Sequence, residues 1–182
     1  ASDGRTLWTY RGRKCANPVP SPAFADGGRV LITGGYGAGS AMISVVRRDG
    51  KFLTKQEFKT QNCGAQIHQP LLHEGRFYVN SNGNKRRDGL LCLDLSGDVK
   101  WKTGRRPNFE RGGILLADGL IFALDGDSGW LHLIEAAPEG YRELSRARPF
   151  KGKQAWAPLA LSDGRLIVRS QKEMMCLDVR GK

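Results

Sequence analysis

Polar and aromatic side chains gather just before several short apolar runs of this chain, in positions suited to binding a ligand. Amide, imidazole, carboxylate, guanidinium and indole groups together supply hydrogen-bond donors and acceptors, charge and a stacking surface, a mixture typical of binding pockets. The alternative is a water-filled, hydrogen-bonded funnel without a ligand. The residues concerned are Gln66, His68 and Gln69, then Asn108, Glu110 and Arg111, then Gln154 and Trp156, with Ser21 before the first run.

Glu110 supplies a carboxylate, a group that can act as a general base. The run Asn108-Phe109-Glu110-Arg111 also allows a simpler interpretation, a local ion pair that secures a loop. The catalytic residues therefore stay unassigned, with Glu110 as the named candidate.

The sequence does not predict a metal site. His68 and His73 are five residues apart around a predicted strand, so their side chains lie on opposite faces. The run 125–129 is similar to the start of a Ca²⁺ loop, but strand residues follow at Trp130 and further oxygen ligands are missing. We interpret it as a polar hairpin turn. The Gly-rich run 34–40 precedes a strand, whereas phosphate cradling needs a helix N-terminus.

The four cysteines suggest structural roles. Cys92 and Cys176 fall within predicted strands, where a thiol packs as a small apolar group. Cys15 and Cys63 occupy equivalent places before two neighbouring strands. A disulfide between Cys15 and Cys63 is left open, because the sequence does not fix their Cα separation.

A pattern that recurs four times must position all these residues. Each repeat has a short apolar strand, a glycine-containing turn, a second strand, a loop and a third strand. The turn glycines, Gly28, Gly75, Gly119 and Gly164, recur at a period of about 45 residues. This period is typical of β-propellers, whose repeats fold into blades. We predict an all-β fold, a β-propeller of four-stranded antiparallel blades, with four blades here that are complete or part of a larger seven- or eight-bladed ring.

The predicted blades cover residues 17–60, 64–104, 108–147 and 153–182 of a single segment, 1–182. The last repeat stops inside its turn, before a fourth strand. Aligning Gly4 with Gly97 places Trp8 at the position of Trp101. Residues 1–10 are therefore expected to supply a closing outer strand or to form the end of a preceding blade. An unpaired edge favours association, so further blades or a second copy are the other ways to close the ring.

The run Gly89-Leu90-Leu91-Cys92-Leu93-Asp94-Leu95-Ser96-Gly97-Asp98-Val99-Lys100-Trp101 resembles the repeat of the pyrroloquinoline-quinone-like (PQQ-like, or quinoprotein-like) β-propellers. That repeat has an apolar strand ending in Asp, a Thr/Ser-Gly turn, and a Trp four residues after the Gly. Residues 175–181 match its first half and residues 3–8 its second, whereas the first and third repeats depart from it. The resemblance implies that Trp8 and Trp101 dock against a neighbouring blade, a contact of about 3 kcal/mol if fully buried.

The resemblance covers proteins of different function. Some members are alcohol dehydrogenases that use PQQ and Ca²⁺ and often carry two adjacent cysteines, but no two cysteines adjoin here. PQQ and Ca²⁺ are therefore expected only in a larger ring. We expect a non-catalytic module of the bacterial envelope, periplasmic or exported, that binds a protein, small-molecule or polysaccharide partner. The alternative is a PQQ-dependent alcohol dehydrogenase.

Composition excludes several other classes. Hydrophobic residues make up 40% and charged residues 26%, which fits a folded domain without an apolar run that could cross a bilayer. The net charge is +11, but its densest clusters, 11–14, 85–87 and 105–106, are short and lack interleaved stacking aromatics. We therefore expect no specific nucleic-acid partner. The chain opens on polar turn residues and not on a signal peptide, so the expected compartment rests on the resemblance.

Overall fold

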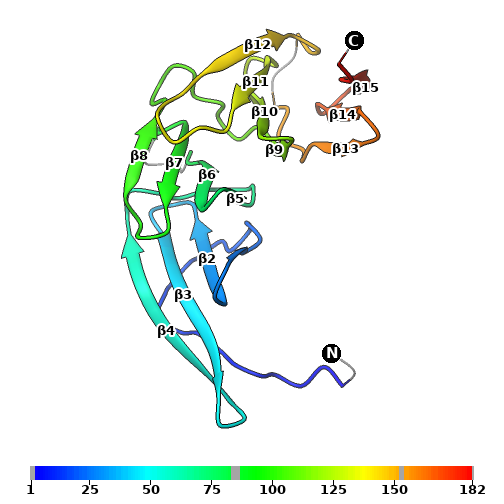
Figure 1. Ribbon diagram of the computed structural model, residues 1–182. Helices are drawn as coiled ribbons and strands as arrows, with labels where there is room; N and C mark the ends of the chain where they lie inside the picture. Colours follow the sequence, from blue (N-terminus) through cyan, green and yellow to red (C-terminus); the bar gives the residue numbers. More distant parts are fainter. Residues whose placement is uncertain (1–2, 83–86, 152–153, 182) are drawn as a thin grey trace.

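The structure is a computed structural model that describes residues 3–82, 87–151 and 154–181. The described residues form strands and no helices, in four antiparallel sheets that follow one another along the chain. The sheets stand face to face along an open arc, with the first and last at its two ends (Figure 1). The predicted all-β, propeller-like arrangement of blades is thus confirmed, and the arc is not closed. Among these residues no helix is suited to crossing a membrane.

In each sheet every strand pairs with the next one along the chain. The first three sheets have four strands each and the last has three. Their members are β1 (Ala23–Ala25), β2 (Arg29–Gly34), β3 (Gly39–Arg48) and β4 (Lys51–Thr60); β5 (Leu71–His73), β6 (Arg76–Asn80), β7 (Leu90–Asp94) and β8 (Val99–Lys102); β9 (Ile114–Ala117), β10 (Leu120–Leu124), β11 (Leu131–Glu135) and β12 (Glu143–Ala147); and β13 (Ala160–Ser162), β14 (Arg165–Arg169) and β15 (Met174–Asp178).

The hydrophobic core consists of layers between neighbouring sheets, because the middle strands are apolar on both faces. Phe77 and Tyr78 are consecutive in β6 and both fully buried, yet they belong to different layers. Side chains of a strand alternate between its faces, so Phe77 packs toward the first sheet and Tyr78 toward the third. Continuous apolar runs such as this one therefore fit a sheet that is covered on both sides.

A shift of register separates the two apolar residues of the outer strand β8. Leu93 pairs with Val99, but Cys92 pairs with Trp101, so one residue of β8 is unpaired between them. This β-bulge turns Val99 toward the layer shared with the first sheet and Trp101 toward the layer shared with the third. The outer strand therefore contributes to both neighbouring interfaces.

The N-terminal segment does not complete the last sheet. Residues 3–10 form no strand, and the Tyr10 hydroxyl donates a hydrogen bond to Oε1 of Gln56 in β4, 2.5 Å away. The first and last sheets lie at opposite ends of the arc, and this segment lies apart from β15 (Figure 1). Among the described residues the last sheet consists of β13, β14 and β15. The two expected roles of residues 1–10, as a closing outer strand or as the end of a preceding blade, stay predictions, as do the blade boundaries.

Candidate functional site

Three residues predicted for the site come together between successive sheets. Gln66, Arg111 and Trp156 precede the innermost strands β5, β9 and β13, which stand on the concave side of the arc (Figure 1). Arg111 is central: its Nε donates a hydrogen bond to Oε1 of Gln66 at 2.7 Å, and its guanidinium carbon lies 5.0 Å from the centroid of the Trp156 ring. We call Gln66, His68, Glu110, Arg111 and Trp156 the inner cluster.

A glycine in the third sheet makes room for the indole of Trp156. A Cβ atom at Gly126 would lie 2.7 Å from Cδ1 of Trp156, closer than real contacts allow. The backbone of Gly126 also accepts a hydrogen bond from the amide of Ala155 at 3.0 Å. Trp156 is therefore held between Arg111 and a bare stretch of backbone, and only part of the ring remains exposed.

His68 links the second sheet to the next two. Its Nε2 donates to the backbone carbonyl oxygen of Arg111 at 3.1 Å, since a carbonyl can only accept. Burial lowers the pKa of His68 below its usual value, and hydrogen bonds to the backbone of Arg111 and of Trp156 oppose this shift in part. The ring is therefore neutral at neutral pH, and its hydrogen bonds join the loops that carry Arg111 and Trp156.

Glu110 forms an ion pair with its neighbour. Its Oε2 lies 3.8 Å from Nη1 of Arg111, and both side chains are more than a quarter exposed. Phe109 and Glu110 have positive φ angles of 63° and 43°, uncommon for residues with a side chain, and Phe109 is completely buried against His132. The pair thus lies on a tightly anchored loop, in agreement with the simpler interpretation of the sequence. The proposed role of Glu110 as a base stays a prediction.

Asn108 belongs to a buried polar link that sequence reasoning missed. Its Nδ2 donates to Oδ1 of Asn82 and to the carbonyl of Gly104, both at 3.1 Å, and Nδ2 of Asn82 donates in return to the carbonyl of Asn108. Asn80 reaches across in the same way, donating to the carbonyl of Gly112 at 2.9 Å. These asparagines fasten the loop of the inner cluster to the second sheet. The polar run directly after the apolar strand β6 was the available signal.

Three predicted residues lie apart from Arg111 in their contacts. Nε2 of Gln69 donates to the carbonyl of Pro22, 3.0 Å away, and so ties the second sheet to the first. Gln154 is exposed with a φ angle of 63°, and Ser21 is also exposed. The structure therefore assembles part of the predicted rim as one cluster and leaves the remainder around it.

The two motif tryptophans have different surroundings. Nε1 of Trp101 donates to the carbonyl of Ala137 in the third sheet's β11–β12 loop, 2.9 Å away, and its ring lies 6.1 Å from Tyr78 and 6.3 Å from Tyr141, centroid to centroid. Trp8 is 37% exposed and lies outside any strand. Trp101 thus packs between two sheets, whereas no such layer among the described residues encloses Trp8.

The cysteines and carboxylates do not form a site for PQQ and Ca²⁺ within the described residues. Cys15, Cys63, Cys92 and Cys176 are free thiols, so the disulfide left open between Cys15 and Cys63 is not formed. Burial raises the pKa of Cys63 to about 11. Across residues 3–82, 87–151 and 154–181, no three His, Cys, Asp or Glu side chains are grouped so that they could hold a metal ion. The described residues therefore offer no such group of side chains to Ca²⁺.

The comparisons with known proteins point to one family. A family model described as outer membrane protein assembly factor BamB matches residues 1–182, the full length of the chain. No curated protein matches the chain. The family match covers all four sheets and every residue of the inner cluster.

Proposed function

The chain belongs to the PQQ-like repeat family described as outer membrane protein assembly factor BamB, and from this premise we propose that it is a partner-binding propeller module of the bacterial envelope that acts in outer-membrane protein assembly. The observation that supports this role is the inner cluster, in which Gln66, Arg111 and Trp156 from three successive sheets converge. Fold alone does not choose a function, so the proposal depends on this cluster.

The composition of the inner cluster suits protein recognition. Arg and Trp are the residue types most enriched among those that dominate binding energy at interfaces. The side chains of Arg111 and Glu110 are 28% and 29% exposed, and the indole of Trp156 is also part-exposed. Each side chain is therefore partly accessible to a partner, while neighbouring residues fix its position.

The inner cluster is also held in place before any partner arrives. Gln66 fixes the guanidinium from one side and Trp156 from the other, while His68 holds the backbone of Arg111. A partner then loses less free energy in ordering side chains, which raises affinity. We expect a loop or extended segment of a protein that offers carbonyl or carboxylate oxygens to Arg111 and an apolar side chain to Trp156.

The test uses the full-length protein in its bacterial host. Trp156→Ala should lower the amount of correctly assembled outer-membrane proteins and abolish photo-crosslinking from a probe placed at Gln154. Trp130→Ala is a matched control, because it removes another Arg–Trp stack, with Arg146 at 5.1 Å, outside the inner cluster. Normal assembly by a folded Trp156→Ala protein, with crosslinking unchanged, would contradict the proposal.

A further inference from the structure

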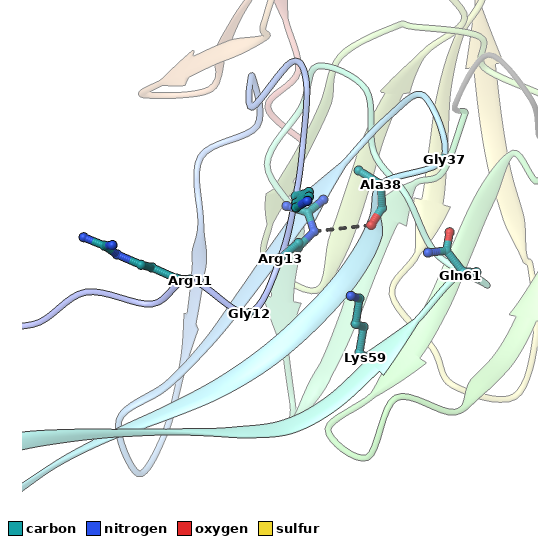
Figure 2. Close-up of a pocket in the computed structure, with 8 residues that line it drawn as sticks. Arg11, Gly12, Arg13, Gly37, Ala38, Lys59 and Gln61 are labelled. Carbon is teal, nitrogen blue, oxygen red and sulfur yellow. Dashed lines mark hydrogen bonds between the residues drawn. The ribbon is translucent and has the colours of Figure 1, made fainter.

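A basic hollow of about 350 Å³ lies on the first sheet and is lined by residues outside the inner cluster. It is lined by the segment Arg11–Lys14, by the tip of the β2–β3 hairpin at Gly37 and Ala38, and by Lys59 and Gln61 at the end of β4. Figure 2 shows Lys59 and Gln61 rising from one side toward Arg13 and Ala38, whereas Arg11 extends away from the hollow. Residues far apart in the sequence thus meet around one space.

Arg13 fixes the N-terminal segment over this hollow. Its Nη2 donates to the carbonyl of Gly39 at 2.8 Å and its Nε to the carbonyl of Ala38 at 3.4 Å, the bond drawn in Figure 2. Gly39 has a φ of 68°, and a Cβ atom there would lie 2.3 Å from the carbonyl oxygen of Thr60. The hairpin tip and the end of β4 are therefore held in close contact, which gives the hollow a defined shape.

The charges around the hollow are of one sign. Four basic residues border it, of which Arg11 directs its side chain away, and no acidic residue borders it. Within the described part of the chain, Arg11, Lys14 and Lys59 form no ion pair, and Glu57 on the same strand is engaged by Ser44 and Lys55. Like charges gathered in this way repel one another and attract an anion.

We propose that this hollow binds a phosphate group. A guanidinium carries five N–H donors in a planar fork, so Arg13 retains donors beyond the two bonds that it makes to the backbone. Lys59 adds a mobile positive charge and Gln61 an amide donor, the combination that phosphate oxygens accept. The volume of about 350 Å³ leaves room for a phosphate that is carried on a larger molecule. This inference is independent of the proposed function of the inner cluster.

The experiment measures binding of two probes by the purified full chain at about 0.1 M salt, where the Debye length is about 10 Å. Pyrophosphate, followed by ³¹P NMR and calorimetry, tests soluble phosphates. Sedimentation with phosphatidylcholine vesicles, with and without phosphatidic acid, tests a lipid headgroup. We expect Lys59→Gln to weaken binding of at least one probe about tenfold, the effect of removing one favourable contact of about 1.4 kcal/mol.

Two matched variants separate a defined site from general attraction to a chain of charge +11. Lys172→Gln removes one exposed lysine from the β14–β15 turn and should leave binding unchanged. Lys51→Gln removes one from a second basic hollow, which Arg5 and Arg47 also line. The proposal is overturned if neither probe binds, or if Lys172→Gln or Lys51→Gln weakens binding as much as Lys59→Gln does. Urea unfolding of each variant verifies that the fold is retained.

Discussion

The guanidinium carbon of Arg111 lies 5.0 Å from the centroid of the Trp156 ring, so the loop before β9 is stacked on the loop before β13. Because Nε of Arg111 also donates a hydrogen bond to Oε1 of Gln66, one side chain joins three successive sheets. A propeller blade normally contacts its neighbours through apolar faces, and this polar contact adds a link near the innermost strands. Its contribution to stability and its exposure to a partner can be measured separately.

Arg111→Ala should lower the free energy of unfolding by about 1–2 kcal/mol, because it removes a partly buried stack and a hydrogen bond. Arg146→Ala, which removes the stack on Trp130 at 5.1 Å from a side chain that is 58% exposed, should cost less than about 0.5 kcal/mol. Urea denaturation followed by tryptophan fluorescence makes the comparison. Equal losses in the two variants would show that the link between sheets adds nothing.

Stability should fall as the pH drops below about 6.5, in part because of His68. Burial holds the pKa of His68 below its usual value, so the unfolded chain binds a proton that the folded chain does not. The stabilisation is complete above the unfolded pKa and is lost as the pH falls toward the folded pKa. The urea midpoints at pH 7.5 and pH 5.5 should differ less in His68→Gln than in the wild-type protein.

An NMR titration of the His68 ring provides the independent measurement. Glu110 and Arg111 are the charged groups on the facing loop, and their opposite charges largely offset each other. A measured pKa at or above 6.5 in the folded protein would be inconsistent with this account.

Trp101→Ala should destabilise the protein by about 3 kcal/mol, through the loss of ring contacts with Tyr78 and Tyr141 and of the hydrogen bond to Ala137. Trp101→Phe keeps an aromatic ring and should cost about 1 kcal/mol for the unsatisfied carbonyl. Trp8→Ala is the control, since Trp8 is 37% exposed, and should cost under about 1 kcal/mol. Chemical denaturation gives all three values. A loss of stability in Trp8→Ala as large as that in Trp101→Ala would contradict this prediction.

The thiols should react with an aromatic disulfide reagent in order of exposure. Cys176 is exposed and should react within the first phase at pH 8. Cys63 has a pKa of about 11, so only a small fraction of this thiol is ionised to the reactive thiolate at pH 8. Cys63 is also buried, so we expect it to react only after the chain unfolds. A Cys176→Ser variant should lose the fast phase. Rapid modification of Cys63 in the native protein would mean that the layer between the first two sheets opens readily.

The sequence by itself determined the repeat and the class of fold. The turn glycines and the runs that are apolar on both faces specify strands sandwiched between sheets, because alternation in a strand sends neighbours such as Phe77 and Tyr78 to opposite sides. It also indicated part of the inner cluster: since equivalent positions of a repeat lie at the same edge of successive blades, Gln66, Arg111 and Trp156 were expected near one another. These inferences need only local patterns and a period.

The tertiary structure alone decided which side chains pair and where the N-terminal segment lies relative to the last sheet. Arg111 bonds to Gln66 as well as to the adjacent Glu110, Lys59 approaches Arg13, and residues 3–10 lie apart from β15. These outcomes depend on how far the arc turns, on where a β-bulge rotates a strand and on which loops thereby meet. The bond between Gln66 and Arg111 joins residues 45 positions apart, a separation at which local conformational preference carries no information about distance.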